Sequence, residues 1–292
     1  MTDDIDLDAY FARIGYTGPR EPTLAVLREL HRLHPRAIPF ENIDVLLGRG
    51  IKVDLASIQA KLVAGGRGGY CFEHNGLFSA VLKALGFRVT DLAARVQWGR
   101  PEGALGPRTH RLSRVETEDG PYQVDVGFGG ITQTAPLRFE AGIEQDTGLG
   151  WFRFVAIGDD LQLQFRLPSG WAPVYQLEHA PQQPVDYELL NWWISTHPAS
   201  PFTANLAAAW VGEDRRYSVF NNQLSIYPHA GGVEKQVLSA AELEALMHDT
   251  FGLTRPADPA TLAALYETIQ ARPPRGEQQA PEKAEERAQE RG

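Results

Sequence analysis

The first 86 residues carry apolar side chains at helical spacing and show no sustained two-residue alternation. This periodicity predicts a helical bundle rather than a sheet. The expected helices cover residues 6–14, about 22–33, 56–63 and a segment that begins near residue 71. In the last of these, Leu77, Val81 and Leu85 recur every four residues, and Gly86 is a typical helix stop.

From residue 87 the apolar period changes to two, which predicts antiparallel strands. Strands are expected at 88–97, 109–115 and 122–126, and the last two form a hairpin with a turn at residues 118–120. Three more are expected at 152–156, 161–166 and 172–176. Short, evenly spaced strands of this kind are typical of a small antiparallel β-barrel or sandwich.

After residue 186 the pattern is mixed. Helices are expected at 186–195 and 240–251, a loop at 197–202, and short strands at 217–220 and 223–227. The predicted fold class is therefore α+β, in three parts that cover residues 1–86, 87–185 and 186–271. Residues 272–292 contain no large apolar side chain, so we expect a disordered tail there.

Composition restricts the function. The 292-residue chain has a net charge of −9, which argues against binding to nucleic acid or to anionic membranes. Because Cys71 is the only cysteine, the chain cannot form an intrachain disulfide. The acidic N-terminus lacks the apolar segment of a signal peptide, and no apolar run approaches transmembrane length. We therefore expect a cytoplasmic protein.

Cys71 stands where a glycine-rich loop meets a predicted helix. The partial positive charge at a helix N-terminus stabilises a thiolate over a thiol, so Cys71 is a candidate nucleophile. Position alone favours an inert, buried thiol about as strongly. Cys71 and His74 have the spacing of a metal-binding pair, but no second pair accompanies them, so we expect no metal site.

A cysteine nucleophile needs a base, and the base needs a group that orients it. Among the eight histidines, His110 lies on a predicted strand, and the second arm of the same hairpin carries Asp125 between two valines. A turn centred on residues 119–120 places position 110 opposite position 129, so His110 and Asp125 share a face. Their offset of four residues is roughly 13 Å, too far for direct contact without a bulge, a shifted register or a longer turn.

Five motifs, in order along the chain, resemble those of the arylamine N-acetyltransferases, and most closely their bacterial members. They are Arg13-Ile14-Gly15-Tyr16, Pro39-Phe40-Glu41-Asn42, Arg67-Gly68-Gly69-Tyr70-Cys71-Phe72-Glu73, Thr109-His110 and Asp125-Val126-Gly127-Phe128-Gly129-Gly130. The resemblance extends to about Thr254. It implies a catalytic triad of Cys71, His110 and Asp125 with a short His–Asp contact, and therefore a hairpin register different from the one drawn above.

The resemblance also implies an architecture and an activity. The architecture is a helical bundle, a central β-barrel and a C-terminal α/β lid, with a cleft between them, as in papain-like enzymes. The activity is acetyl transfer from acetyl-CoA to aromatic amines or hydrazines through an acetyl-cysteine intermediate. It implies that Phe40, Val96 and Phe128 line the acceptor pocket, although ordinary core packing explains these three almost as well. It also implies that Thr109, Gly129 and Phe202 lie near the acyl-CoA cleft.

Three further expectations concern the surroundings of the nucleophile. Glu41 and Arg67 are expected to pair beneath it. His74 departs from the glutamine of many bacterial relatives, and on the first helical turn it should point away from Cys71. His31 and His34 lie on what resembles a surface helix and are expected to be solvated.

Other activities fit the same residues. An offshoot of the family could form amides from a carrier-bound acyl chain, with the same triad and a different pocket. A cysteine hydrolase or a transglutaminase-like enzyme would share the chain order of Cys, His and Asp. A binding module would leave Cys71 inert. The family also has a tendency to self-associate, so a homo-oligomer is one expected partner state.

Overall fold

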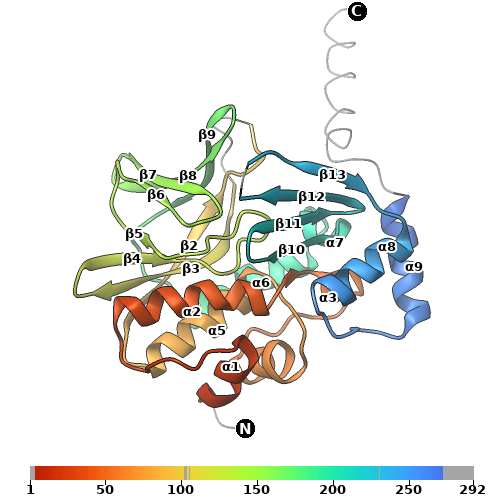
Figure 1. Cartoon of the computed structure of the whole chain (residues 1–292), viewed down its shortest axis with the longest axis horizontal. Coiled ribbons are helices and arrows are strands. Elements are labelled where there is room, and N and C mark those ends of the chain that lie inside the picture. The colour runs from red at the N-terminus through yellow and green to blue at the C-terminus, as the bar shows by residue number, and fades with distance from the viewer. Residues whose placement is uncertain (1–3, 102–103, 105, 230, 272–292) are drawn as a thin grey trace, which may run out of the picture.

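The computed structural model describes residues 4–101, 104, 106–229 and 231–271, and its first part is helical, as predicted (Figure 1). The helices of this part are α1 (Leu7–Ile14), α2 (Leu24–Ala37), α3 (Ile43–Leu46), α4 (Leu55–Ile58), the π-helical segment η1 (Gln59–Ala64) and α5 (Cys71–Ala84). Helix α1 begins and ends at capping residues that the sequence indicates. The Asp6 side chain accepts a hydrogen bond from the Ala9 N–H, and Gly15 closes the helix with a left-handed φ of 70°.

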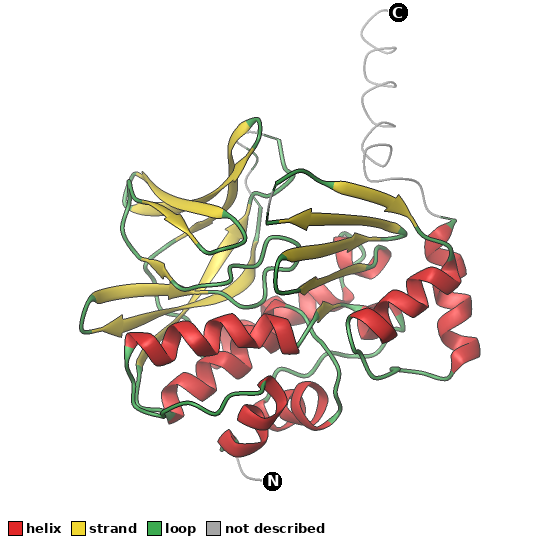
Figure 2. Cartoon of the chain, viewed as in Figure 1, coloured by secondary structure: helices red, strands yellow, loops and turns green. Residues whose placement is uncertain are grey.

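Eight strands form one antiparallel sheet that curls into a nearly closed barrel (Figure 2). In chain order they are β2 (Arg88–Val96), β3 (Arg108–Thr117), β4 (Gly120–Val124), β5 (Leu137–Arg138), β6 (Glu144–Asp146), β7 (Trp151–Ile157), β8 (Asp160–Leu167) and β9 (Gly170–Leu177). Their order across the sheet is β5-β4-β3-β2-β9-β8-β7-β6. All six predicted strands of this region are present, and buried aromatic side chains such as Phe154 and Tyr175 fill the interior.

The register of the β3–β4 hairpin differs from the predicted one by two residues. Thr117 pairs with Gly120 and Ser113 pairs with Val124, so position 110 projects opposite 127 rather than 129. The reason is a two-residue turn, closed by the Thr117 hydroxyl, which donates to Gly120 O and accepts from the Asp119 N–H. A shift of two keeps the predicted shared face and halves the offset between positions 110 and 125.

A second antiparallel sheet has the order β1-β10-β11-β12-β13. Its strands are β1 (Phe40–Glu41), β10 (Ala207–Val211), β11 (Arg215–Phe220), β12 (Gln223–Pro228) and β13 (Glu234–Val237). The helices of this region are α6 (Pro184–Thr196), α7 (Pro201–Ala204), α8 (Ala240–Ala245), its π-helical continuation η2 (Leu246–Thr250) and α9 (Pro259–Gln270). The sequence pattern predicted β11, β12, α6 and the α8–η2 helix. It did not predict β10, β13, α9 or the short helix α7, which begins inside the predicted loop.

Strand β1 joins the helical part of the chain to the second sheet, because Phe40 pairs with Ala209 of β10. Figure 1 shows α1, α2 and α5 below the barrel, the second sheet beside it, and α8 and α9 at the outer side of that sheet. A buried cluster that includes Phe40, Cys71, Ala93 and Ala209 lies where the helices, the barrel and the second sheet meet. The candidate nucleophile is therefore at the junction of all three.

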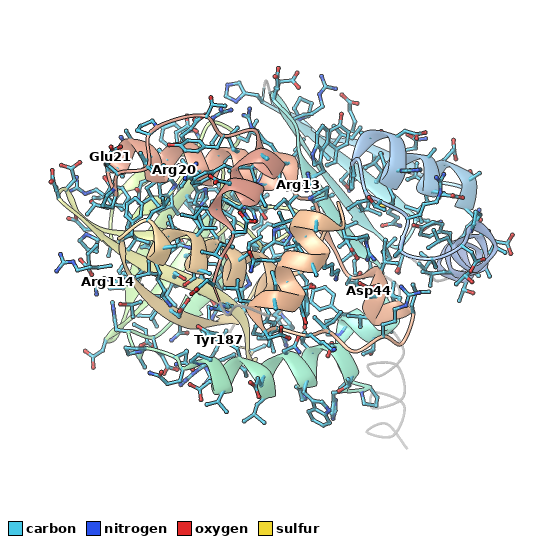
Figure 3. All side chains as sticks on the ribbon, turned by 90° about the horizontal axis from the view of Figure 1, so that it is seen from below. Arg13, Arg20, Glu21, Asp44, Arg114 and Tyr187 are labelled. Atoms are coloured by element: carbon cyan, nitrogen blue, oxygen red, sulfur yellow. The ribbon has the colours of Figure 1, made fainter. Side chains whose placement is uncertain are left out.

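Helix α6 packs against this junction through Tyr187 and Ile194. Its Tyr187, labelled in Figure 3, donates a hydrogen bond to the Leu92 carbonyl of the barrel at 2.9 Å. The Arg111 guanidinium stacks over the Tyr187 ring at 4.2 Å. Within the described ranges, no helix has the length and apolar character needed to cross a membrane. The tail predicted at 272–292 lies outside the described residues.

Candidate active site

Cys71 is the first residue of α5, as the glycine-rich approach predicted, and is 4% exposed. The Glu73 carboxylate accepts the Tyr70 N–H at 3.0 Å and so fixes the start of the helix. The loop before it lies tightly against β1, because a Cβ on Gly68 would stand only 2.2 Å from the Pro39 carbonyl oxygen. Only glycine allows this approach, which holds the thiol at the helix N-terminus.

The structure brings Cys71, His110 and Asp125 together. The Cys71 sulfur donates to the Thr109 carbonyl at 3.6 Å, next to His110, and His110 Nε2 lies 2.6 Å from Asp125 Oδ2. This leaves Nδ1 as the ring nitrogen available to Cys71. Burial alone would lower the pKa of His110, but the charge and hydrogen bond of Asp125, with the contribution of Cys71, raise it to about 10.

Asp125 is fully buried and accepts hydrogen bonds through both oxygens. Besides His110, its donors are Asn75 Nδ2 at 2.9 Å, the Gly127 N–H at 3.1 Å and the Tyr175 hydroxyl at 3.1 Å. Burial would raise the pKa of this carboxyl, but the charge of His110 and these donors lower it. The carboxylate therefore stays ionised beside the imidazole. Sequence reasoning missed Asn75, although it follows Cys71 by one helical turn, and it had no signal for Tyr175.

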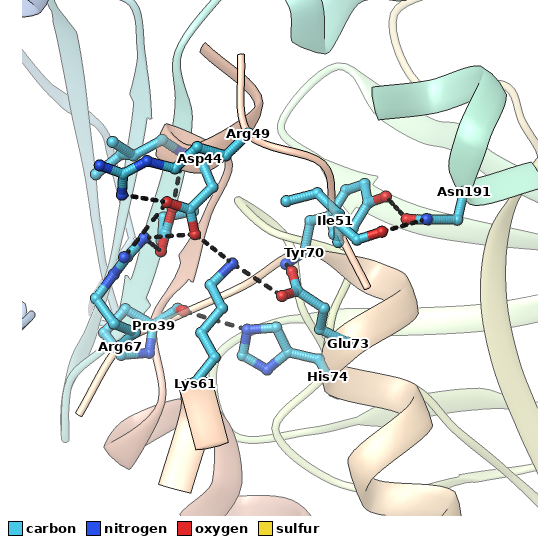
Figure 4. A network of polar contacts seen from close by, with 12 residues as sticks. Pro39, Asp44, Arg49, Ile51, Lys61, Arg67, Tyr70, Glu73, His74 and Asn191 are labelled. Carbon is cyan, nitrogen blue, oxygen red and sulfur yellow. Dashed lines mark hydrogen bonds and ion pairs between the residues drawn. The ribbon is translucent and has the colours of Figure 1, made fainter. Parts of the chain in front are cut away.

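A buried charge cluster lies beneath the nucleophile loop (Figure 4). The predicted Glu41–Arg67 pair is confirmed at 2.6 Å, and Arg67 also reaches Asp44 at 3.1 Å. Lys61 bridges Asp44 at 3.0 Å and Glu73 at 2.8 Å, two contacts that the sequence did not predict. Because these residues come from β1, α3, η1, the loop and α5, the cluster ties the nucleophile loop to four neighbouring elements.

Comparisons with known proteins identify the family of this chain. A family model described as N-acetyltransferase matches residues 23–258. The arylamine N-acetyltransferase of Mycobacterium tuberculosis is 43% identical over 256 residues, which cover 85% of this chain and 89% of that protein. The chain belongs to the arylamine N-acetyltransferase family. As a member of this family, it is an acetyltransferase.

Two further relatives support the same family assignment. The arylamine N-acetyltransferase of Escherichia coli K12 is 42% identical over 249 residues, which cover 85% of this chain and 88% of that one. The solved structure of the Mycobacterium marinum arylamine N-acetyltransferase in complex with CoA matches with a TM-score of 0.87 at 40% identity, covering 90% of this chain and 99% of that one. The mixed fold with its curled eight-stranded barrel is thus shared with solved arylamine N-acetyltransferases.

The residues that the family resemblance assigned to the acceptor pocket have different neighbours. Phe128 is half-buried and meets the His110 ring edge-on at 5.1 Å. Val96 ends β2 and pairs with Tyr175 of β9. Phe40 is buried and stacks on His74, with 6.3 Å between the ring centroids. Of these three residues, Phe128 is the one whose ring contacts the His110 ring.

Among the residues assigned to the acyl-CoA cleft, Thr109 contacts Cys71 directly, and Gly129 and Phe202 lie near Phe40. Thr109 supplies the carbonyl that Cys71 contacts. Gly129 has a left-handed φ of 96°, and a Cβ there would lie 3.5 Å from the Phe40 ring. Phe202 is half-buried, with its ring centroid 6.2 Å from that of Phe40. Across the described part of the chain, no group of three or more His, Cys, Asp or Glu side chains could hold a metal ion.

The prediction that His31 and His34 are solvated is wrong, because both are fully buried in this acetyltransferase. They continue the series that Leu27 and Leu30 begin, at spacings of three, four and seven residues, so they belong to the buried face of α2. This spacing was a signal in the sequence. His31 Nε2 accepts the Asp125 N–H at 3.2 Å, and burial lowers the pKa of His31 to about 4.

His34 and His74 form a hydrogen-bonded chain in which the donor and the acceptor of each bond are fixed. The Pro39 carbonyl can only accept, so His74 Nε2 donates to it at 3.1 Å, and His74 Nδ1 accepts from His34 Nε2 at 3.0 Å. His34 Nδ1 then accepts from the Tyr10 hydroxyl at 2.9 Å. Both histidines are neutral, and burial lowers the pKa of His74 to about 4. Both nitrogens of His74 are thus occupied away from Cys71, as expected.

Proposed function

We propose that this acetyltransferase moves an acetyl group from acetyl-CoA to the nitrogen of aromatic amines or hydrazines through an acetyl-cysteine intermediate. The relatives carry the name of this activity, and a similar structure is a complex with CoA. The observation that carries the proposal is the buried contact of 2.6 Å between His110 Nε2 and Asp125 Oδ2, next to Cys71 at a helix N-terminus. This is the arrangement that activates a thiol.

In the first half-reaction His110 takes the proton of Cys71 through Nδ1, and Asp125 holds the resulting imidazolium through Nε2. The Cys71 sulfur attacks the thioester carbonyl of acetyl-CoA and forms a tetrahedral oxyanion. The first N–H groups of α5, which have no helix carbonyl to bind, would stabilise that oxyanion. The C–S bond to CoA then breaks, and the CoA sulfur leaves as the thiol with the proton held by His110.

In the second half-reaction the amine attacks the carbonyl carbon of acetyl-Cys71. His110 accepts the proton that the nitrogen loses, and the bond between the carbonyl carbon and the Cys71 sulfur breaks. The products are the N-acetyl compound and the regenerated pair of Cys71 and His110. Because CoA leaves before the amine reacts, the kinetics should be ping-pong.

The layout of the site suggests how the two substrates are held. Phe128, against the His110 ring, would form one wall of the acceptor pocket, and Phe40 and Val96 would complete it. Thr109, Gly129 and Phe202 would border the pantetheine arm. We also propose that residues 1–86, 87–185 and 186–271 act as bundle, barrel and lid around this cleft, in the manner of papain-like enzymes.

The mass of the intact protein after incubation with acetyl-CoA and no amine tests the mechanism. The wild type should gain one acetyl group, and Cys71→Ser, which keeps the shape of the side chain but has a far weaker nucleophile, should gain none. An aromatic hydrazine added afterwards should remove the acetyl group from the wild type.

Two outcomes would contradict the proposal. An acetyl group on both proteins would place the acceptor at another residue. No acetyl group on a wild type whose thiol reacts with alkylating agents would favour an amide synthase or a hydrolase.

A further inference from the structure

Arg216 of β11 is a buried cation without an acidic partner. It is 4% exposed, and its Nε and Nη1 atoms have no hydrogen-bond partner among the described residues. Nor does any carboxylate of the described chain form an ion pair with it. A buried charge normally keeps its place only when it is paired and hydrogen-bonded, because desolvation costs several kcal/mol. Arg216 therefore has unused binding capacity.

Its neighbours are aromatic. The Arg216 guanidinium lies over the Phe165 ring at 4.9 Å and near the Tyr227 ring at 5.9 Å. Ring faces attract the cation, but they do not satisfy its N–H groups in the plane of the fork. Burial lowers the pKa of Arg216 to about 10, so the side chain stays charged at neutral pH.

The other buried arginine beside the site is treated differently. Arg67, 9% exposed, has Glu41 at 2.6 Å and Asp44 at 3.1 Å. The fold thus supplies two carboxylates where an arginine has a structural task. At Arg216 it supplies none, which leaves the guanidinium fork for an anion from outside.

The position of Arg216 links it to the acetyl-transfer site. Arg216 and Ser218 project from the same face of β11, since strand side chains alternate. A Cβ on Gly130 would stand 2.5 Å from the Ser218 hydroxyl, so this face lies against the glycine run that follows Asp125. Phe165, under the guanidinium, belongs to the barrel core. Arg216 therefore lies between the second sheet and the barrel.

Gly150 packs closely against both groups, because a Cβ there would stand 2.5 Å from the Phe165 ring and 3.4 Å from Arg216 Nη2.

We propose that Arg216 is an anion-binding residue of the substrate cleft, which takes the paired oxygens of a carboxylate or phosphate on a substrate whose reacting end lies at Cys71. The planar fork of arginine matches both groups. Two substrates of the proposed function, on which this inference rests, can supply such a group. They are the phosphates of acetyl-CoA and the carboxylate of an acidic arylamine.

Matched pairs of substrates separate these two sources. S-acetylpantetheine lacks the phosphates of acetyl-CoA, and 4-aminobenzamide lacks the charge of 4-aminobenzoate. Arg216→Met, which keeps the length of the side chain, should raise KM roughly tenfold or more for the charged member of one pair and leave its neutral member unchanged. Arg215→Gln is the control, because Arg215 is the preceding residue and pairs with Asp214 on the surface at 2.9 Å.

Thermal unfolding of the unacetylated protein gives a second readout that needs no acetyl transfer. CoA or 4-aminobenzoate should raise the Tm of the wild type and of Arg215→Gln, and the shift should be lost in Arg216→Met. Without ligand, Arg216→Met should be at least as stable as the wild type, because it removes an unpaired buried charge.

Two results would overturn the proposal. One is a lower Tm of ligand-free Arg216→Met together with unchanged KM values for acetyl-CoA and for 4-aminobenzoate. This result would make Arg216 a structural cation. The other is equal ligand shifts in Arg216→Met and the wild type. If acetyl transfer itself fails in the wild type but the Arg216-dependent Tm shift persists, the proposed function fails and the anion site stands.

Discussion

Two histidines buried near Cys71 have pKa values shifted in opposite directions. His110 is 3% exposed and His74 is 1% exposed, so desolvation lowers the pKa of both. His110 has the Asp125 carboxylate at 2.6 Å, and its pKa rises to about 10. His74 donates to the Pro39 carbonyl and accepts from the neutral His34, no carboxylate hydrogen-bonds to it in the described residues, and burial lowers its pKa to about 4. The carboxylate accounts for the difference.

The comparison shows that sequence distance from the nucleophile is a poor guide to a catalytic base. His74 follows Cys71 by three residues, yet both of its ring nitrogens are bound elsewhere. His110 comes from another strand, and its acid partner leaves it one nitrogen for the thiol. An acid partner and an available nitrogen identify the base.

The largest expected effect comes from removing the charge of Asp125. Asp125→Asn keeps the shape of the side chain but cannot stabilise the imidazolium, and its amide can force the wrong tautomer on His110. We expect kcat/KM for acetyl transfer to fall by about 10⁴-fold, as for triads of this kind. Steady-state kinetics at pH 7.5 measure this.

The matched control is Asp91→Asn. Asp91 is a partly buried carboxylate of the same barrel that pairs with Lys83 and Arg111 rather than with a histidine. It should keep kcat/KM within about tenfold of wild type. A folded Asp125→Asn enzyme with activity that close to wild type would show that the carboxylate does not distinguish His110 from His74.

Local signals in the sequence were enough for half of this comparison. The glycines and the helical period placed Cys71 at the start of α5, and strand parity put His110 and Asp125 on one face. The register was off by two because it depends on a turn closed by the Thr117 hydroxyl, which period-two counting does not detect. The family resemblance, rather than the pattern, indicated that the contact is short.

The other half depends on tertiary contacts. The burial of His31 and His34 was readable from their spacing to Leu27, but a histidine on a helix was interpreted as solvated. Tyr175 reaches Asp125 from a strand 50 residues away, and no local pattern marks such a contact. The two-residue strand β1 is likewise defined only by its pairing with β10.

A smaller effect should follow from replacing His74. Its folded-state pKa of about 4 lies below the ordinary value of 6.5, so the unfolded chain binds a proton that the folded protein does not as pH falls between these values. Stability is therefore lost on acidification. Glutamine does not titrate, yet it can donate to the Pro39 carbonyl and accept from His34. Wild type should therefore lose roughly 2 kcal/mol of unfolding free energy more than His74→Gln when the pH is lowered from 7.5 to 5.

Urea unfolding at the two pH values measures this difference. His229→Gln, the same substitution at an exposed position, is measured in parallel as the control. The sign at His110 is opposite, because a raised pKa gives stability that is complete below pH 6.5 and lost as pH rises toward about 10. A His74→Gln difference that does not change with pH would mean that His74 is not held neutral.

The smallest effect should come from Tyr10→Phe, which removes the donor at the end of the histidine chain. The fully buried Tyr10 hydroxyl donates a hydrogen bond to His34 Nδ1 at 2.9 Å. Removing the hydroxyl leaves that nitrogen without a donor. We expect about 1 kcal/mol less unfolding free energy at pH 7.5. Activity should be unchanged, since the chain ends at the Pro39 carbonyl and not at Cys71. A tenfold fall in kcat/KM would instead mean that the order of protons from Tyr10 to His74 acts on the thiol, and the contrast between His74 and His110 would then be one of degree.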